Sequence, residues 1–157
     1  MVTMKNLIIC VSIHHGNTEK IAKAMAEILN AKLAKPNEVT MDDLSNYDLI
    51  GFGSGIYAGE HHETLLDFAD KLSQLKNKKA IIFSTRGILP VRLCHKSLRK
   101  KILEKKVDVI GEFSCRGLLT EWPFNVIGGI SKNMPNKKDL ENARKFAREL
   151  KNKPGKG

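Results

Sequence analysis

Short apolar runs alternate along the chain with longer stretches in which apolar residues recur every three or four positions. The runs are typical of strands buried on both faces of a sheet, and they cover residues 7–11, 47–53, 80–83 and 107–113, with a weaker strand predicted around 38–41. The longer stretches predict helices over residues 21–29, 65–72, 91–102 and 140–150. Asn17 or Thr18 is available to cap the first of these helices.

This alternation predicts an α/β fold, because a strand that follows a helix returns to the same sheet in parallel. Five strands fit a doubly wound parallel sheet of order 2-1-3-4-5 with helices on both faces, which is a three-layer sandwich. In such a sheet, ligands bind outside the carboxyl ends of the strands, where the strand order reverses between the first and third strands. We therefore expect functional residues in the segments that follow Val11, Phe52 and Phe83.

The length of 157 residues predicts a single domain over residues 1–152, followed by a flexible basic tail over 153–157. With 41% hydrophobic and 28% charged residues, the chain is not of the disordered class. No apolar run approaches the roughly 20 residues that a membrane span needs. Cys10, Cys94 and Cys115 are odd in number and form no close pair, which favours reduced thiols in a cytoplasm.

The charge balance is unusual, with 27 Lys and Arg against 17 Asp and Glu, a formal net charge of +10. This excess indicates either an acidic partner or anionic ligand, or only a solubilising surface rich in lysine. The basic residues concentrate in residues 96–106 and in the tail, without interleaved aromatic residues or a nucleic-acid motif. We therefore expect no specific binding of nucleic acid.

The first candidate segment follows the strand at residues 7–11 and contains a glycine between hydroxyl-bearing residues. Backbone N–H groups at the start of a helix hold phosphate well, and the single glycine allows close approach. The segment lacks the Gly-Lys-Ser/Thr of a nucleotide-hydrolysing loop and the three glycines of a dinucleotide fingerprint, so it favours a monophosphate that is held but not transferred. The alternative is an ordinary strand-to-helix turn. The candidate phosphate-binding residues are Ser12, His14, His15, Gly16, Asn17 and Thr18.

The second and third candidate segments suit a flat ligand. Three glycines between Gly53 and Gly59 let the backbone approach it, and an aromatic ring between them is available to stack on it. The alternative is a flexible turn whose tyrosine is half-buried packing. The candidate residues are Ser54, Gly55, Ile56, Tyr57 and Ala58 in the second segment and Ser84, Thr85, Arg86 and Gly87 in the third.

Together the three segments resemble the flavodoxin family. The match rests on Gly16-Asn17-Thr18-Glu19 and on Gly53 to Gly59, and it covers nearly the whole chain at the length of a short-chain flavodoxin. The resemblance implies the flavodoxin-like fold and the cofactor FMN, with the phosphate on the first segment and the isoalloxazine ring between the second and third. It also implies that Tyr57 covers one face of that ring.

The chain departs from the family pattern at several positions. Flavodoxins carry Ser and Thr where this chain has Ile13, His14 and His15, so either imidazoles replace the hydroxyl contacts or both rings point to solvent. Ala58 stands where flavodoxins usually have glycine. His61 and His62 count as cations near the ring; as neighbours in sequence they do not suit a zinc site.

We expect an FMN-binding electron-transfer protein whose redox partners present an acidic docking face to residues 96–106. An alternative is an FMN oxidoreductase on the same fold, because Gly55 to Gly59 followed by His61 also resembles flavodoxin-like protoporphyrinogen dehydrogenases. A third possibility is a phosphate-binding module without flavin. The segment 117–135 follows the fifth strand, where Trp122 and Phe124 wall the flavin site, bind a partner or cover the core.

Overall fold

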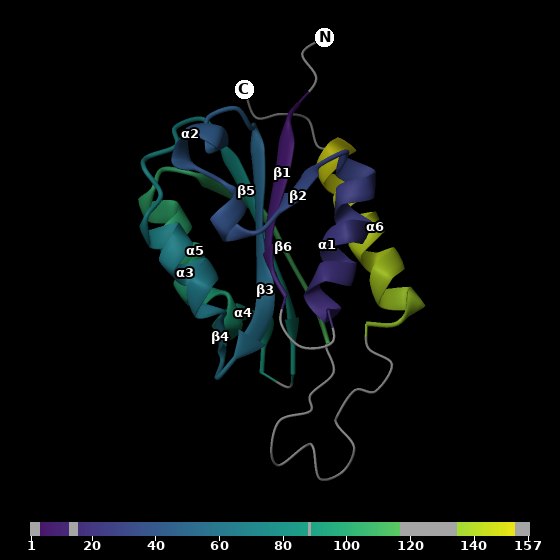
Figure 1. Cartoon of the computed structure of the whole chain (residues 1–157). Coiled ribbons are helices and arrows are strands. Elements are labelled where there is room, and N and C mark those ends of the chain that lie inside the picture. The colour runs from purple at the N-terminus through teal and green to yellow at the C-terminus, as the bar shows by residue number, and fades with distance from the viewer. Residues whose placement is uncertain (1–3, 13–15, 88, 117–134, 153–157) are drawn as a thin grey trace.

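The computed structural model of the chain describes residues 4–12, 16–87, 89–116 and 135–152 (Figure 1). The expectations for His14 and His15, for Trp122 and Phe124, and for the basic tail lie outside these residues. No helix in the described ranges is long and apolar enough to cross a membrane.

A parallel sheet with the strand order β2-β1-β3-β5-β6 forms the middle layer (Figure 1). It confirms the doubly wound order 2-1-3-4-5, and a short additional strand, β4, pairs antiparallel with the end of β3. The strands are β1 (Asn6–Val11), β2 (Lys32–Ala34), β3 (Leu49–Tyr57), β4 (Glu60–His61), β5 (Lys79–Arg86) and β6 (Asp108–Arg116).

Helices cover both faces of the sheet and complete the three layers (Figure 1). One face carries α1 (Asn17–Leu29) and α6 (Lys137–Asn152), which pack against each other as well as against the sheet. The other face carries α3 (Glu63–Asp70), α4 (Val91–Cys94) and α5 (Lys96–Glu104). Two short elements, the 3-10 helix η1 (Pro36–Glu38) and α2 (Met41–Leu44), connect β2 to β3.

The core consists of two apolar clusters, one on each face of the sheet. In β1 the side chains of Leu7, Ile9 and Val11 enter the cluster under α3 and α5, whereas those of Ile8 and Cys10 enter the cluster under α1 and α6. Successive side chains of a strand point to opposite faces. A strand that is covered on both faces therefore needs a continuous apolar run, as the sequence has here.

The three cysteines are free and buried. Burial raises the pKa of Cys10 and of Cys115 to about 12, and a nearby carboxylate adds to the shift in each case. Both thiols therefore stay protonated at neutral pH and behave as small apolar side chains.

The predicted strand around residues 38–41 is wrong, and the edge strand β2 lies before it. Pro36 begins η1, and Thr40 caps α2. Thr40 Oγ1 accepts from the backbone N–H of Asp43 at 3.1 Å, and the Asp43 carboxylate accepts from the N–H of Thr40 at 2.9 Å. This reciprocal cap commits the backbone at residues 40–43 to a helix start.

The predicted helix over residues 91–102 is divided at His95, where α4 ends and α5 begins. His95 is fully buried. Its imidazole bonds to residues of β5 and β6, so this position faces the sheet rather than solvent.

Candidate functional site

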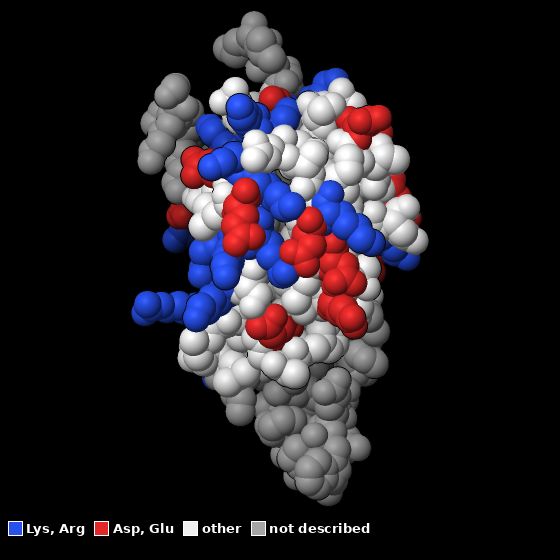
Figure 2. Space-filling model, turned by 90° about the vertical axis from the view of Figure 1, so that its left-hand side faces the viewer, with Lys and Arg blue, Asp and Glu red and all other residues white. Residues whose placement is uncertain are grey.

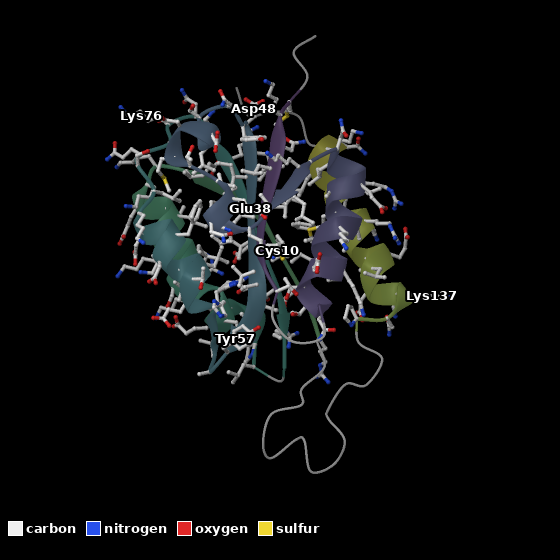
Figure 3. All side chains as sticks on the ribbon, viewed as in Figure 1. Cys10, Glu38, Asp48, Tyr57, Lys76 and Lys137 are labelled. Atoms are coloured by element: carbon white, nitrogen blue, oxygen red, sulfur yellow. The ribbon has the colours of Figure 1, made fainter. Side chains whose placement is uncertain are left out.

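The three predicted segments lie side by side at one edge of the sheet. Val11 of β1 is in register with Ser54 of β3, and Ser54 is in register with Ser84 of β5. Figure 3 shows Tyr57 at this carboxyl edge, whereas Asp48 marks the opposite edge. The strand order therefore brings together the segments that the sequence separates.

The first segment leads from β1 into α1. Gly16 is the N-cap of α1 with a φ of 63°, and as a glycine it has no side chain of its own to cap the helix. The prediction that Asn17 or Thr18 caps the helix is wrong, since both lie inside the first turn. The start of α1 therefore presents the backbone N–H groups of Asn17 and Thr18, whereas that of Glu19 donates to Ser12 Oγ. Among the described residues, the one atom within 4 Å of a Cβ on Gly16 would be a carboxylate oxygen of Glu19, at 3.9 Å.

The hydroxyl-bearing residues of the first segment serve the fold as well. Thr18 is buried, and its Oγ1 lies 2.7 Å from Oγ1 of Thr85 at the end of β5. Ser12 Oγ accepts from the backbone N–H of Glu19 at 3.3 Å. These contacts fix the start of α1 against the sheet, so the groups left for a ligand are mainly backbone N–H groups.

The second segment is a hairpin, not the loop that its glycines suggested. Strand β3 continues through Ser54, Gly55 and Ile56 to Tyr57, which pairs with Glu60 of β4. The two turn residues, Ala58 and Gly59, have φ values of 51° and 81°. Positive φ at both central positions is the mark of a two-residue hairpin turn whose twist matches its strands. Ala58 adopts this left-handed conformation despite its Cβ.

Replacing Ala58 with glycine is therefore expected to stabilise the protein. An alanine held at positive φ is strained by about 1 kcal/mol, and glycine removes that strain. We expect Ala58→Gly to raise the free energy of unfolding by a few tenths to about 1 kcal/mol. Part of the strain energy released is offset, because glycine also has more conformational entropy in the unfolded chain. The control is Gly59→Ala, which adds the same strain at φ 81° and sets a Cβ 3.3 Å from Leu89, and should destabilise. Urea unfolding of both variants measures the two effects, and equal signs would contradict the turn geometry.

The ring of Tyr57 is half-buried on the hairpin. It meets the ring of His62 edge-on, with centroids 5.3 Å apart. It also lies over Gly55, because a Cβ at that position would come within 3.0 Å of the tyrosine hydroxyl. Gly55 is thus needed beneath the tyrosine.

The third segment belongs largely to β5. Ser84 and Thr85 are buried, and Arg86 is half-buried. The Arg86 guanidinium donates to the carbonyl of Leu89 at 3.1 Å, whereas its Nε–H is buried with no partner among the described residues. A buried donor without a partner is costly, so this atom suits a ligand acceptor. Gly87 follows directly and is partly exposed.

A layer of serines and histidines lies beneath this edge, and the sequence reasoning did not anticipate it. Ser54, Ser84 and Ser114 occupy one register position across β3, β5 and β6. Ser54 Oγ lies 2.8 Å from Nδ1 of His61, and Ser84 Oγ lies 2.7 Å from Nε2 of His95 and 2.8 Å from Ser114 Oγ. The two imidazoles stack with centroids 5.0 Å apart. A serine at the same register position of three neighbouring strands was the available signal.

His95 is also bound to a carboxylate. Its Nδ1 lies 3.0 Å from Glu112, which accepts two further bonds from Arg99, at 2.9 and 2.6 Å. Burial raises the pKa of Glu112, but the bonds from Arg99 and His95 outweigh that effect and lower it. Ser84, His95 and Glu112 thus have the order of a hydrolase triad. Because Ser84 and His95 are fully buried, this arrangement cannot present a nucleophile to a substrate.

His61 is 2% exposed and carries no charge at neutral pH. Burial, and then the neighbouring His95, lower the pKa of His61 to about 3. Burial also lowers the pKa of His95, although Glu112 partly offsets it. The expectation that His61 acts as a cation near the ring is therefore wrong. His62 is half-buried, and its Nδ1 accepts from the backbone N–H of Thr64 at 3.0 Å.

Comparison with known proteins agrees with this architecture. Residues 8–117 match the flavodoxin domain family. An uncharacterized protein of Methanocaldococcus jannaschii is 50% identical over 148 residues, which cover 94% of this chain and 98% of the relative. Flavodoxin 2 of Bacillus cereus superposes with a TM-score of 0.68 at 20% identity, over 94% of this chain and 97% of that one. The Fusobacterium nucleatum flavodoxin bound to flavin mononucleotide superposes with a TM-score of 0.66 at 14% identity, over 94% and 98% of the two chains.

Proposed function

The chain belongs to the flavodoxin family, and we propose that it binds FMN at the carboxyl edge of its sheet and carries electrons between redox proteins. The observation that supports this most is the grouping of three features on adjacent strand ends. These features are the start of α1 at Gly16, the hairpin that carries Tyr57 and the Nε–H of Arg86, which has no partner among the described residues.

In this proposal the phosphate of FMN binds at the first segment. The backbone N–H groups of Gly16, Asn17 and Thr18 face it, and the partial positive charge of the helix start favours a dianion. His14 and His15 are proposed to assist as hydrogen-bond donors, and Ser12 orients the segment through its bond to Glu19.

The isoalloxazine ring is proposed to lie between the second and third segments. Tyr57 offers an aromatic face, and Ala58 and Gly59 bring the backbone close. Arg86 is proposed to donate from its Nε–H, which no described residue accepts, and Gly87 follows it without a side chain. FMN supplies the redox chemistry when bound, whereas the chain binds and orients it and shields it from water.

An electron carrier fits better than an oxidoreductase acting on a porphyrinogen. His61, which supported the resemblance to protoporphyrinogen dehydrogenases, lies beneath the hairpin at 2% exposure and is not available to a substrate. The Ser84–His95–Glu112 arrangement is closed in the same way. Neither group is therefore placed to exchange a proton with a substrate.

The experiment that tests the proposal is the absorbance spectrum of the purified protein, followed by titration of the flavin-free chain with FMN and with riboflavin. We expect a flavin spectrum and tighter binding of FMN than of riboflavin. Failure to bind either flavin would leave only a phosphate-binding or interaction module. Turnover of a porphyrinogen, with no electron exchange with redox proteins, would favour the oxidoreductase instead.

Gly16→Asp is expected to weaken FMN binding by at least tenfold relative to Gly16→Asn, or about 1.4 kcal/mol. The two side chains have nearly the same shape, and both tolerate the positive φ of this position. They differ in charge, and only the carboxylate repels the phosphate dianion. Riboflavin, which lacks the phosphate, should bind both variants equally. Fluorescence titration measures all four affinities, and equal FMN affinities would put the phosphate elsewhere.

The basic stretch 96–106 is proposed to contact an acidic face of a redox partner, and the structure divides it into two sets. Lys101 bonds to the Asp70 carboxylate at 2.7 Å, Lys105 donates to the Asp70 carbonyl and Arg99 bonds to Glu112. Figure 2 shows Lys and Arg gathered beside Asp and Glu on this side of the molecule. The exposed residues left for a partner are Lys96, Lys100 and Lys106.

Association with such a partner is expected to slow as salt is added, because exposed charges more than about 10 Å apart are screened at 0.1 M ionic strength. Replacing Lys96, Lys100 and Lys106 with glutamine should reduce both the rate and its salt dependence. The control is the same triple change at Lys20, Lys23 and Lys145 on α1 and α6. Stopped-flow reduction by the partner measures the rates, and a salt-insensitive rate would contradict the proposal.

A further inference from the structure

The hairpin that carries Tyr57 has little sheet structure of its own to hold it. Strand β4 contains two residues and forms two pairs with β3, Ile56 with His61 and Tyr57 with Glu60. A two-stranded ribbon of this size is not stable alone in water. The position of the hairpin therefore depends on contacts beyond the ribbon.

Ser54 and His61 provide the buried part of those contacts. Ser54 Oγ donates its single proton to the Gly55 carbonyl at 2.7 Å and accepts from the backbone N–H of His62 at 2.9 Å. Its remaining neighbour, Nδ1 of His61 at 2.8 Å, must then donate the proton of that bond. His61 is consequently the Nδ1–H tautomer, and its buried Nε2 has no partner among the described residues.

The positions of the protons on His95 follow from its hydrogen bonds in the same way. The Glu112 carboxylate can only accept, so Nδ1 of His95 donates to it. Because His95 is neutral, its Nε2 accepts from Ser84, whose oxygen then accepts from Ser114. His95 is thereby anchored to β5 and β6 and holds the junction of α4 and α5, just after the segment that contains Arg86.

We propose that His61 and His95 are positioning residues that join the two segments flanking the flavin ring. His61 belongs to the hairpin, His95 to the segment that follows β5, and their rings meet with centroids 5.0 Å apart. The contact between the two imidazole rings therefore sets the distance between Tyr57 and Arg86. The inference rests on the proposed FMN site, although neither imidazole is proposed to touch the flavin.

The contact between the His61 and His95 rings requires both imidazoles to be neutral, because a proton on one ring places a buried charge against the other. A hollow of about 580 Å³ lies beside the hairpin, and the buried His61 is among its lining residues. The charged groups that act on His95 are Glu112, Arg99 and Arg86. The hollow beside His61 is also lined by Glu60, Glu63, Asp67, Asp70 and Lys101.

The test compares His61→Asn with His61→Leu. Asparagine places an N–H donor near the position of Nδ1 and keeps the bond to Ser54, whereas leucine fills a similar volume without it. We expect His61→Leu to weaken FMN and riboflavin alike by at least tenfold and His61→Asn by less than threefold. His95→Gln, which keeps a polar group near Nε2, should resemble His61→Asn. Equal losses in the asparagine and leucine variants, or none in either, would overturn the proposal.

A second measurement uses the flavin-free protein, so that it decides the inference even if the proposed function fails. Nitrogen chemical shifts should show the proton on Nδ1 of both His61 and His95 at pH 7. Amide hydrogen exchange over residues 54–62 should quicken at least tenfold in His61→Leu and much less in His61→Asn. An Nε2–H tautomer at His61, or unchanged amide exchange in the leucine variant, would refute the proposed positioning role of His61 and His95. Absence of flavin binding with these signatures intact would refute only the FMN site.

Discussion

Acidification from pH 6.5 to pH 4 is expected to reduce the free energy of unfolding by about 3 kcal/mol through His61 alone. The pKa of this imidazole is about 3 in the folded protein against an ordinary value of 6.5. Between these values the unfolded chain binds a proton that the folded protein refuses, so stability falls as the pH is lowered. One pKa unit corresponds to about 1.4 kcal/mol, which gives a total near 5 kcal/mol once the pH is well below 3.

The measurement is urea unfolding of the wild-type chain and of His61→Asn at pH 7 and pH 4. The other titrating groups are common to the two proteins and cancel in the comparison, apart from His95, whose ring contacts that of His61. We expect wild type to lose about 3 kcal/mol more than the variant over this range, which is a large share of the 5–15 kcal/mol that typically stabilises a domain. Parallel losses in the two proteins would show that His61 titrates normally.

Gly53→Ala is expected to be the most damaging of the single-methyl substitutions in the sheet. Gly53 pairs with Phe83 of β5, and the ring of Phe83 lies across the glycine. A Cβ at this position would fall far inside van der Waals contact with three ring carbons. Phe83 is fully buried, so its ring cannot move out to solvent to relieve the clash. Overpacking of this kind costs about 3 kcal/mol or more at its upper end.

The matched control is Gly51→Ala, two residues earlier on the same face of β3. There the nearest atom to the added carbon is Cγ1 of Ile8 at 3.2 Å, which a small shift relieves. We expect its effect to be below about 1 kcal/mol in either direction. In a Phe83→Ala background, Gly53→Ala should lose most of its effect, because the ring is gone. Equal destabilisation by the two glycine substitutions would contradict the packing.

The parallel sheet and its order could be predicted because the central strands β1, β3 and β5 are covered on both faces, whereas the short edge strand β2 was expected at the wrong residues. Continuous apolar runs such as residues 7–11 leave no alternative to a central parallel strand. The placement of the three candidate segments at one edge follows from that order. Which of their side chains bond to one another does not follow from it, and the contact between Thr18 and Thr85 came from the structure alone.

The errors arise where a residue serves a tertiary contact that local pattern does not reveal. Residues 53–59 looked like a flexible loop because of their glycines. Two of those glycines instead make room for an aromatic ring, Gly53 for Phe83 and Gly55 for Tyr57. His61 looked like a surface cation because nothing in its neighbours along the chain indicates Ser54 or His95. Residues 38–41 looked like a strand because of their weak apolar pattern. The cap formed by Thr40 and Asp43 outweighs that pattern and starts a helix instead.

The strand order also has a consequence for synthesis. The strand made first, β1, ends in the interior of the sheet, where it pairs with β2 and with β3. While residues 1–48 emerge from the ribosome, β1 therefore has at most one partner strand, and its other edge stays unpaired until β3 has been made. No two neighbouring strands of the parallel sheet are joined by a tight turn, so each pairing must close a long loop, which slows folding. A nascent chain that ends before β5 leaves the apolar edge of β3 open, and ribosome-bound chains of that length should be the ones that chaperones protect most.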